Sequence, residues 1–128
     1  MTYISDNTDD ARANNVFSFP ESLDRMDGDI ELLVEIAALL VEDCDRLLPE
    51  IREAINTGSA DKLMISAHTL KGAVSNIVAP AAFKAAYDLE MMGRNGVLDR
   101  ADAAYLELDR QIELLKPKLE SITLEDAA

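Results

Sequence analysis

The sequence of 128 residues has no tryptophan and few other aromatic residues, with three tyrosines and three phenylalanines. Because β-strands draw on aromatic and β-branched residues, this scarcity favours helices. Basic residues are also few: 12 Lys and Arg stand against 25 Asp and Glu, which gives a formal net charge of −13. DNA, RNA and anionic membranes bind basic patches, so this charge argues against all three as partners.

Cysteine is nearly absent as well, and the single Cys44 excludes an intramolecular disulfide and fits a reducing compartment. No apolar stretch approaches the roughly 20 residues that span a bilayer. The N-terminus lacks a basic start followed by an apolar run, which is the pattern of a secretory signal. We therefore expect a soluble, cytoplasmic protein. Its length is enough for one domain and too short for two ordinary ones.

The first residues differ in composition from the rest of the chain. Residues 1–15 are polar, rich in Asp and Asn, and lack periodicity, which predicts a disordered N-terminal tail. Residues 16–124 are expected to form one helical domain. This domain opens with a short helix that begins at Pro20 and ends near Met26, since proline suits the first turn of a helix.

After this opening, apolar residues recur at alternating spacings of three and four, which is typical of amphipathic helices. Two of the predicted buried stripes are Leu33, Ala37, Leu40, Cys44, Leu47, Ile51 and Ala54, and then Leu63, Ala67, Leu70, Val74 and Ile77. Turn residues, prolines and caps predict helices at about 30–56, from 59 or 61 to before Pro80, at 81–94, and from an Asp99 cap to an end made uncertain by Pro117. The predicted fold class is all-α, an up-down four-helix bundle with a short extra N-terminal helix.

His68 is the only histidine, so any imidazole chemistry must come from this residue. A lone histidine beside an apolar stripe is usually a buried core residue. At about 100° per residue, however, the stripe of residues 63–77 centres about 140° away from His68. An outward-facing imidazole is therefore expected.

Other residues on the same helix face argue against the interpretation of His68 as an ordinary surface histidine. Lys71 and Gly72 follow His68 at the two spacings whose side chains crowd a helical residue most closely. A glycine inside a helix costs about 1 kcal/mol relative to alanine, but it leaves room for another protein to approach the ring. An exposed Met64 offers adaptable apolar contact, and Ser75 adds a small group. Met64 and Ser75 are therefore predicted to contact a docking partner.

The heptapeptide at residues 67–73, AHTLKGA, resembles the signature of the histidine-containing phosphotransfer family. Residues 23–33 and 41–49 also resemble the start and middle of the long second helix of that family. Leu89 and Glu90, followed by Arg94, are similar to its fourth-helix pattern. The resemblance covers about residues 17–115. It departs at Val78, where family members often have a glycine, and this leaves the end of the third helix open.

The resemblance implies a role for each residue near the histidine. His68 would carry the phosphoryl group, Lys71 would be the cation beside it, and Gly72 would give steric access. The side chain of Glu90 would hydrogen-bond the imidazole and orient it. Arg94, one turn further along, would border the docking surface.

The function implied is that of a monomeric carrier in a phosphorelay. A receiver domain of a hybrid histidine kinase would pass a phosphoryl group to His68, and a response-regulator receiver would then take it. The sequence has no nucleotide-binding glycine loop, kinase signature or metal-site spacing, so we expect no cofactor and no autonomous enzyme, with Mg²⁺ supplied by the receiver. Two alternatives stay open: a non-catalytic helical adaptor, and the substrate domain of a chemotaxis-type kinase.

Overall fold

The computed structural model describes residues 15–122. Its helices are α2 (Phe19–Arg25), α3 (Ile30–Asn56), α4 (Ala60–Val74), α5 (Pro80–Asn95) and α6 (Ala101–Glu120). This part of the chain contains no strand, so the prediction of an all-α fold is confirmed. The predicted N-terminal tail, apart from Asn15, lies outside the described residues, as do residues 123 and 124 at the end of the predicted domain.

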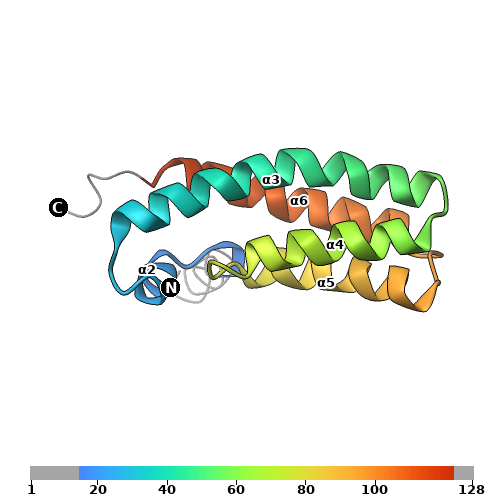
Figure 1. Cartoon of the computed structure of the whole chain (residues 1–128), viewed down its shortest axis with the longest axis horizontal. Coiled ribbons are helices and arrows are strands. Elements are labelled where there is room, and N and C mark those ends of the chain that lie inside the picture. The colour runs from blue at the N-terminus through green and yellow to red at the C-terminus, as the bar shows by residue number, and fades with distance from the viewer. Residues whose placement is uncertain (1–14, 123–128) are drawn as a thin grey trace, which may run out of the picture.

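The helices α3, α4, α5 and α6 run side by side and alternate in direction along the chain (Figure 1). Helix α4 packs between α3 and α5, and α6 packs against the same two helices. Within residues 15–122, no Cα atom of α4 lies within 8 Å of a Cα atom of α6, so these two helices occupy opposite corners of the bundle. One face of α4 is therefore left pointing outward between its two neighbours.

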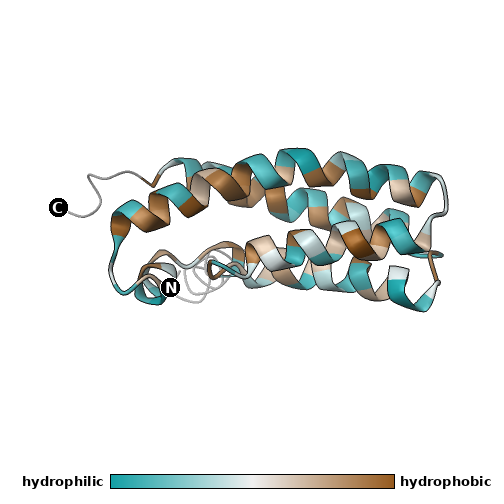
Figure 2. Ribbon diagram, in the orientation of Figure 1, coloured by the Kyte–Doolittle hydropathy of each residue, from teal (hydrophilic) through white to brown (hydrophobic). Residues whose placement is uncertain are grey.

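Hydrophobic residues gather along the sides of the helices that face one another (Figure 2). Every residue of the predicted stripes on α3 and α4 is buried, including Ile77, which lies beyond the end of α4. Cys44 belongs to this core with no exposed surface. Burial raises the pKa of the Cys44 thiol to about 12, so the thiol stays protonated at neutral pH.

Side chains and glycines mark several helix ends where the sequence predicted them. Asp29 accepts a hydrogen bond from the backbone N–H of Leu32 at 3.1 Å, which caps α3. The prediction of an Asp99 cap for the last helix is wrong. The N–H of Ala101 bonds to the carbonyl of Leu98 at 3.0 Å, and this turn makes Arg100 the cap residue, without a side-chain bond.

Two other helix ends are not set by the proline that lies near them. Helix α6 continues through Pro117 to Glu120, because the buried Leu115 and Leu119 hold the helix against the core on both sides of the proline. Helix α4 ends at Val74, well before Pro80. The segment between Val74 and Pro80 is held by hydrogen bonds from other parts of the chain.

Val78, the departure from the family pattern, is bound to the start of α2. Its carbonyl accepts from the N–H of Ser18 at 2.9 Å, and its own N–H donates to the Oγ of Ser22 at 2.9 Å. Val78 does not have the positive φ that would favour glycine. The valine therefore fits this connection without strain, after a helix that has already ended.

Arg25, at the end of α2, completes this junction. Its guanidinium donates to the carbonyl of Ser75 at 2.8 Å and to that of Ile77 at 3.2 Å. Carbonyls at a helix C-terminus lack intrahelical partners, and a cation nearby also complements the helix dipole. The short helix α2 thus binds the C-terminal end of α4 through Arg25.

Candidate functional site

His68 lies on the outward face of α4, as its position relative to the stripe predicted. Its side chain is 64% exposed, whereas Ala67 and Leu70 on either side of it have no exposed surface. The neighbouring helix α5 supplies the group that contacts the ring. The Nδ1 atom of His68 lies 3.1 Å from the Oε2 atom of Glu90.

Glu90 is the centre of a cluster that joins α4 to α5. Its side chain is only 3% exposed, and its Oε1 atom lies 2.7 Å from the Nζ of Lys71. Its Oε2 atom accepts a hydrogen bond from the guanidinium of Arg94 at 2.7 Å, one turn further along α5. The structure thus brings together four predicted site residues: His68, Lys71, Glu90 and Arg94.

The cluster keeps the buried carboxyl ionised. Burial raises the pKa of Glu90, but the ammonium of Lys71 and the hydrogen bonds from Arg94 and His68 together outweigh it, and the pKa falls from 4.5 to about 2. A carboxylate only accepts hydrogen bonds, so the Nδ1 of a neutral His68 ring must be the protonated nitrogen. The lone pair is then on Nε2, the other nitrogen of the exposed ring.

The charge around the imidazole is opposite in sign to that of the whole chain. Two cations, Lys71 and Arg94, share one carboxylate, so the cluster carries an excess of positive charge. The chain as a whole has a formal net charge of −13. Beyond about 8 Å at physiological ionic strength, exposed charges are largely screened, so the local cations dominate what an approaching anion meets.

Two glycines in this region have opposite surroundings. A Cβ atom added at Gly72 would meet nothing within 4 Å, so packing does not require this glycine. A Cβ atom at Gly93 would lie 2.6 Å from the backbone nitrogen of Met64 and 2.7 Å from the carbonyl oxygen of Ala60. Gly93 therefore lets α5 approach α4 closely, one turn from Glu90.

Sequence reasoning missed Gly93, although a glycine inside a helix was itself a signal. The same signal drew attention to Gly72. Only the placement of α5 against α4 distinguishes an open position from one closed by backbone.

The predicted docking residues have different surroundings. Met64 is half-buried, not exposed as predicted, because its backbone faces Gly93 at the contact between the helices. Ser75 is exposed at the end of α4, and its hydroxyl donates to the carbonyl of Gly72 at 2.6 Å. Ser75 thus shares the outward side of α4 with His68, and its own carbonyl is bound by Arg25.

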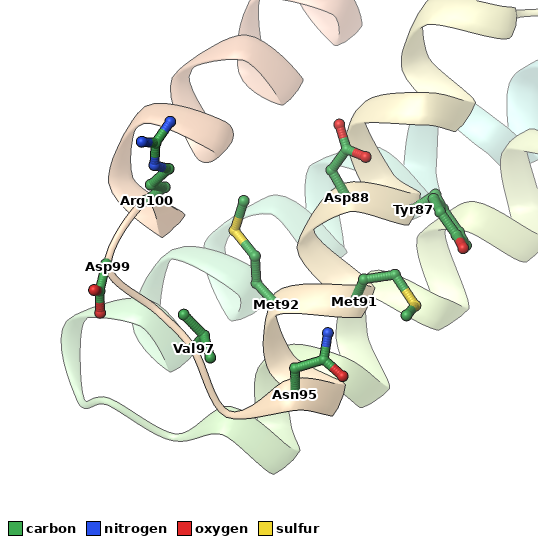
Figure 3. Close-up of a pocket in the computed structure, with 8 residues that line it drawn as sticks. All are labelled: Tyr87, Asp88, Met91, Met92, Asn95, Val97, Asp99 and Arg100. Carbon is green, nitrogen blue, oxygen red and sulfur yellow. The ribbon is translucent and has the colours of Figure 1, made fainter.

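Tyr87 is a further neighbour of the cluster that sequence reasoning missed. The Nζ of Lys71 lies 5.4 Å from the centroid of its ring. Tyr87 precedes Glu90 by one turn of α5, so an aromatic residue at that spacing was the available signal. Figure 3 shows Tyr87 and Met91 extending from one side of α5, while Met92 reaches toward the start of α6.

The groove drawn in Figure 3 has a volume of about 510 Å³ and borders the cluster without containing its reactive groups. Its lining is Tyr87, Asp88, Met91, Met92, Asn95, Val97, Asp99 and Arg100. Within residues 15–122, no group of His, Cys, Asp and Glu side chains is arranged to hold a metal ion. None of the described helices has the length and hydropathy needed to cross a membrane.

Comparison with known proteins identifies the family. A family model for the Hpt domain matches residues 35–117, which include His68, Lys71, Glu90 and Arg94. The chain belongs to the Hpt family. A crystal structure of histidine-containing phosphotransfer protein B from Pseudomonas aeruginosa PAO1 superposes on this Hpt chain with a TM-score of 0.75. The match covers 81% of this chain and 90% of that one at 22% sequence identity, so it supports the shared fold. No curated protein matches this Hpt chain.

Proposed function

We propose that this Hpt chain is a phosphocarrier that accepts a phosphoryl group on the Nε2 atom of His68. The observation that carries the proposal is the pairing of an exposed imidazole with a buried, ionised carboxylate. His68 is 64% exposed, and its Nδ1 lies 3.1 Å from Glu90. This contact fixes the tautomer and directs the nucleophilic nitrogen toward solvent.

The chemical step is a displacement at phosphorus. The Nε2 lone pair attacks in line, a P–N bond forms, and the P–O bond to the aspartyl oxygen of a receiver domain breaks. The leaving carboxylate stays on the receiver. The ring keeps its Nδ1 hydrogen, and the Glu90 carboxylate beside it stabilises the positive charge that the doubly substituted ring gains. Attack by the aspartate of a second receiver reverses the step.

The other site residues support this reaction without taking part in bond changes. Lys71 and Arg94 provide positive charge next to a phosphoryl group on His68, and anions are bound most strongly by such charged donors. Gly72 leaves the space beside the imidazole open for a receiver. Ser75 and the partly exposed Met64 border the same face and contact the docked receiver.

The proposed partners are receiver domains of a hybrid histidine kinase and of a response regulator. The receiver brings the acidic pocket and Mg²⁺, so the carrier itself acts as a phosphotransfer intermediate and not as an autonomous kinase. We place the protein in the cytoplasm as a monomeric up-down bundle, in which the outward face of α4 stays open to each receiver in turn.

Transfer from a receiver tests this function. A receiver phosphorylated with radioactive phosphate is mixed with the full chain, and transfer is followed by rapid quench. His68→Gln is expected to abolish labelling while the helical circular dichroism stays unchanged. The label on the wild-type chain should be lost in acid and kept in alkali. Labelling that persists in His68→Gln would contradict the proposal, and a folded wild-type chain that no receiver labels would favour the adaptor.

A further inference from the structure

The Lys71 side chain is unusually well covered for a lysine on an outward helix face. It is 20% exposed, whereas Lys84, which also pairs with a carboxylate on a helix surface, is 76% exposed. Lysine has a long, flexible side chain with a compact charged end, so an ion pair alone seldom holds it in one place. The contacts that its ammonium makes are with α5.

Two groups on α5 contact the Lys71 ammonium. Glu90 provides a carboxylate oxygen at 2.7 Å, and Tyr87 provides the face of its ring, with the centroid 5.4 Å from Nζ. A cation within about 6 Å of an aromatic centroid is attracted by the negative face of the ring. Tyr87 itself is 43% exposed and lies outside the hydrophobic core of the described residues, so core packing does not explain an aromatic side chain there.

The two contacts differ in what happens when a phosphoryl group arrives. A dianion on His68 competes with the Glu90 carboxylate for the ammonium, because both are anionic acceptors. The ring of Tyr87 carries no net charge, so it holds the ammonium without opposing its attraction to the phosphoryl oxygens.

From this geometry we infer that Tyr87 is a positioning residue, which holds the ammonium of Lys71 beside His68 in both the free and the phosphorylated carrier. The inference rests on the proposed function of His68. It adds a residue that acts only through Lys71 and touches no reacting atom.

The chain offers a matched control for this inference. Tyr105 of α6 has the guanidinium of Arg52 over its ring at 5.1 Å, which is the same type of contact between other helices. Among residues 15–122, no Cα atom of α6 lies within 8 Å of a Cα atom of α4, so changing Tyr105 should leave the surroundings of His68 intact.

The test uses the full chain and a small phosphoryl donor, potassium phosphoramidate, so that no receiver is needed. The P–N bond of the donor breaks, ammonia leaves, and a new P–N bond forms on His68. The half-life of phosphohistidine, followed by ³¹P NMR, is expected to shorten about two- to fivefold in Tyr87→Leu. Tyr87→Phe should restore the wild-type half-life, since it keeps the ring face, and Tyr105→Leu should have no effect.

Two further measurements separate positioning from other causes. In a Lys71→Ala background, Tyr87→Leu should change the half-life no further. In the unphosphorylated chain, the ε-methylene protons of Lys71 should show an upfield ring-current shift that Tyr87→Leu removes and Tyr87→Phe keeps.

Equal half-lives in wild type and Tyr87→Leu would overturn the inference, as would an undiminished effect of Tyr87→Leu without Lys71. The absence of the ring-current shift in wild type would overturn it as well. A wild-type chain that shows the shift but never forms phosphohistidine would contradict the proposed function of His68. In that case Tyr87 would have no role in phosphotransfer either.

Discussion

The contacts between α4 and α5 and those between α3 and α6 use the same kinds of groups with different surroundings. Each interface has a cation over a tyrosine ring and a carboxylate that pairs with that cation. Between α3 and α6, Arg52 pairs with Asp102 at 2.8 Å and lies over Tyr105. Between α4 and α5, Lys71 pairs with Glu90 at 2.7 Å and lies over Tyr87.

The burial of the carboxylate separates the two interfaces. The Asp102 side chain is 74% exposed, and that of Glu90 is 3% exposed. An exposed ion pair contributes about 0–1 kcal/mol because water screens it and two long side chains lose freedom. A buried carboxylate must find partners for its charge, and here a second cation and the imidazole of His68 supply them. The same kinds of groups therefore form an exposed ion pair at one interface and the proposed phosphotransfer site at the other.

The largest effect on stability is expected at Gly93, where α4 and α5 approach each other closely. In Gly93→Ala the new methyl group would collide with backbone atoms of Met64 and Ala60, which cannot rotate away. The free energy of unfolding should fall by about 3 kcal/mol, the cost of overpacking a closed contact. Labelling of the buried Cys44 thiol during urea unfolding measures this loss.

Gly72→Ala is the matched control for that change, since its methyl group enters open space. It should raise stability slightly. Equal losses in the two variants would show that α4 and α5 do not approach closely at Gly93.

The second-largest effect is expected from lowering the pH, which should affect the buried carboxylate of Glu90 more than an exposed one. The folded-state pKa of Glu90, about 2, lies below its ordinary value of 4.5. The ionised carboxylate therefore contributes stability that is fully present above pH 4.5 and is lost as the pH falls toward 2. Glu90→Gln has no carboxyl to protonate, so its stability should fall less over this range. Urea titrations at a series of pH values compare the slopes, and equal slopes would refute the assignment.

Gly72→Gln should separate stability from function. A residue with a higher helix propensity than glycine is expected to raise the free energy of unfolding by about 0.5–1 kcal/mol. The longer side chain should nevertheless slow transfer from a receiver by filling the open space beside His68. Thermal unfolding and rapid-quench transfer are measured on the same preparation. If transfer kept its wild-type rate, Gly72 would have no role in access.

The smallest effect is expected at the exposed interface. Asp102→Ala should change the free energy of unfolding by about 0.5 kcal/mol or less, and added salt should reduce the difference further. Transfer to His68 should keep its wild-type rate. A loss as large as that of Gly93→Ala would mean that burial does not distinguish the two interfaces.

Much of the fold followed from apolar spacing, because that spacing reports which side of a helix is buried. The stripe from Leu33 to Ala54 is buried at each predicted position, and the outward direction of His68 followed from the stripe on its own helix. Boundaries were less certain. The Asp99 cap was wrong because a turn at Leu98 and Ala101, formed between backbone groups, set the start of α6 one residue later.

Sequence patterns did not predict which residues of different helices contact one another. Glu90 entered the predicted site only through the family resemblance, since nothing in its own helix indicates a histidine 22 residues earlier as its partner. Gly93 and Tyr87 were missed because their roles depend on how α5 lies against α4. Periodicity gives the face of each helix, whereas the axial register between two helices depends on side chains that meet across them.

The position of the phosphoryl group on the imidazole ring tests the central claim most directly. The full chain is phosphorylated by a receiver, and ¹⁵N and ³¹P NMR then identify the ring nitrogen that carries phosphorus. Because the Oε2 of Glu90 lies 3.1 Å from Nδ1 and accepts its hydrogen, phosphorus is predicted on Nε2 of His68, with Nδ1 still bearing its hydrogen. Phosphorus on Nδ1, or on any residue other than His68, would contradict the account.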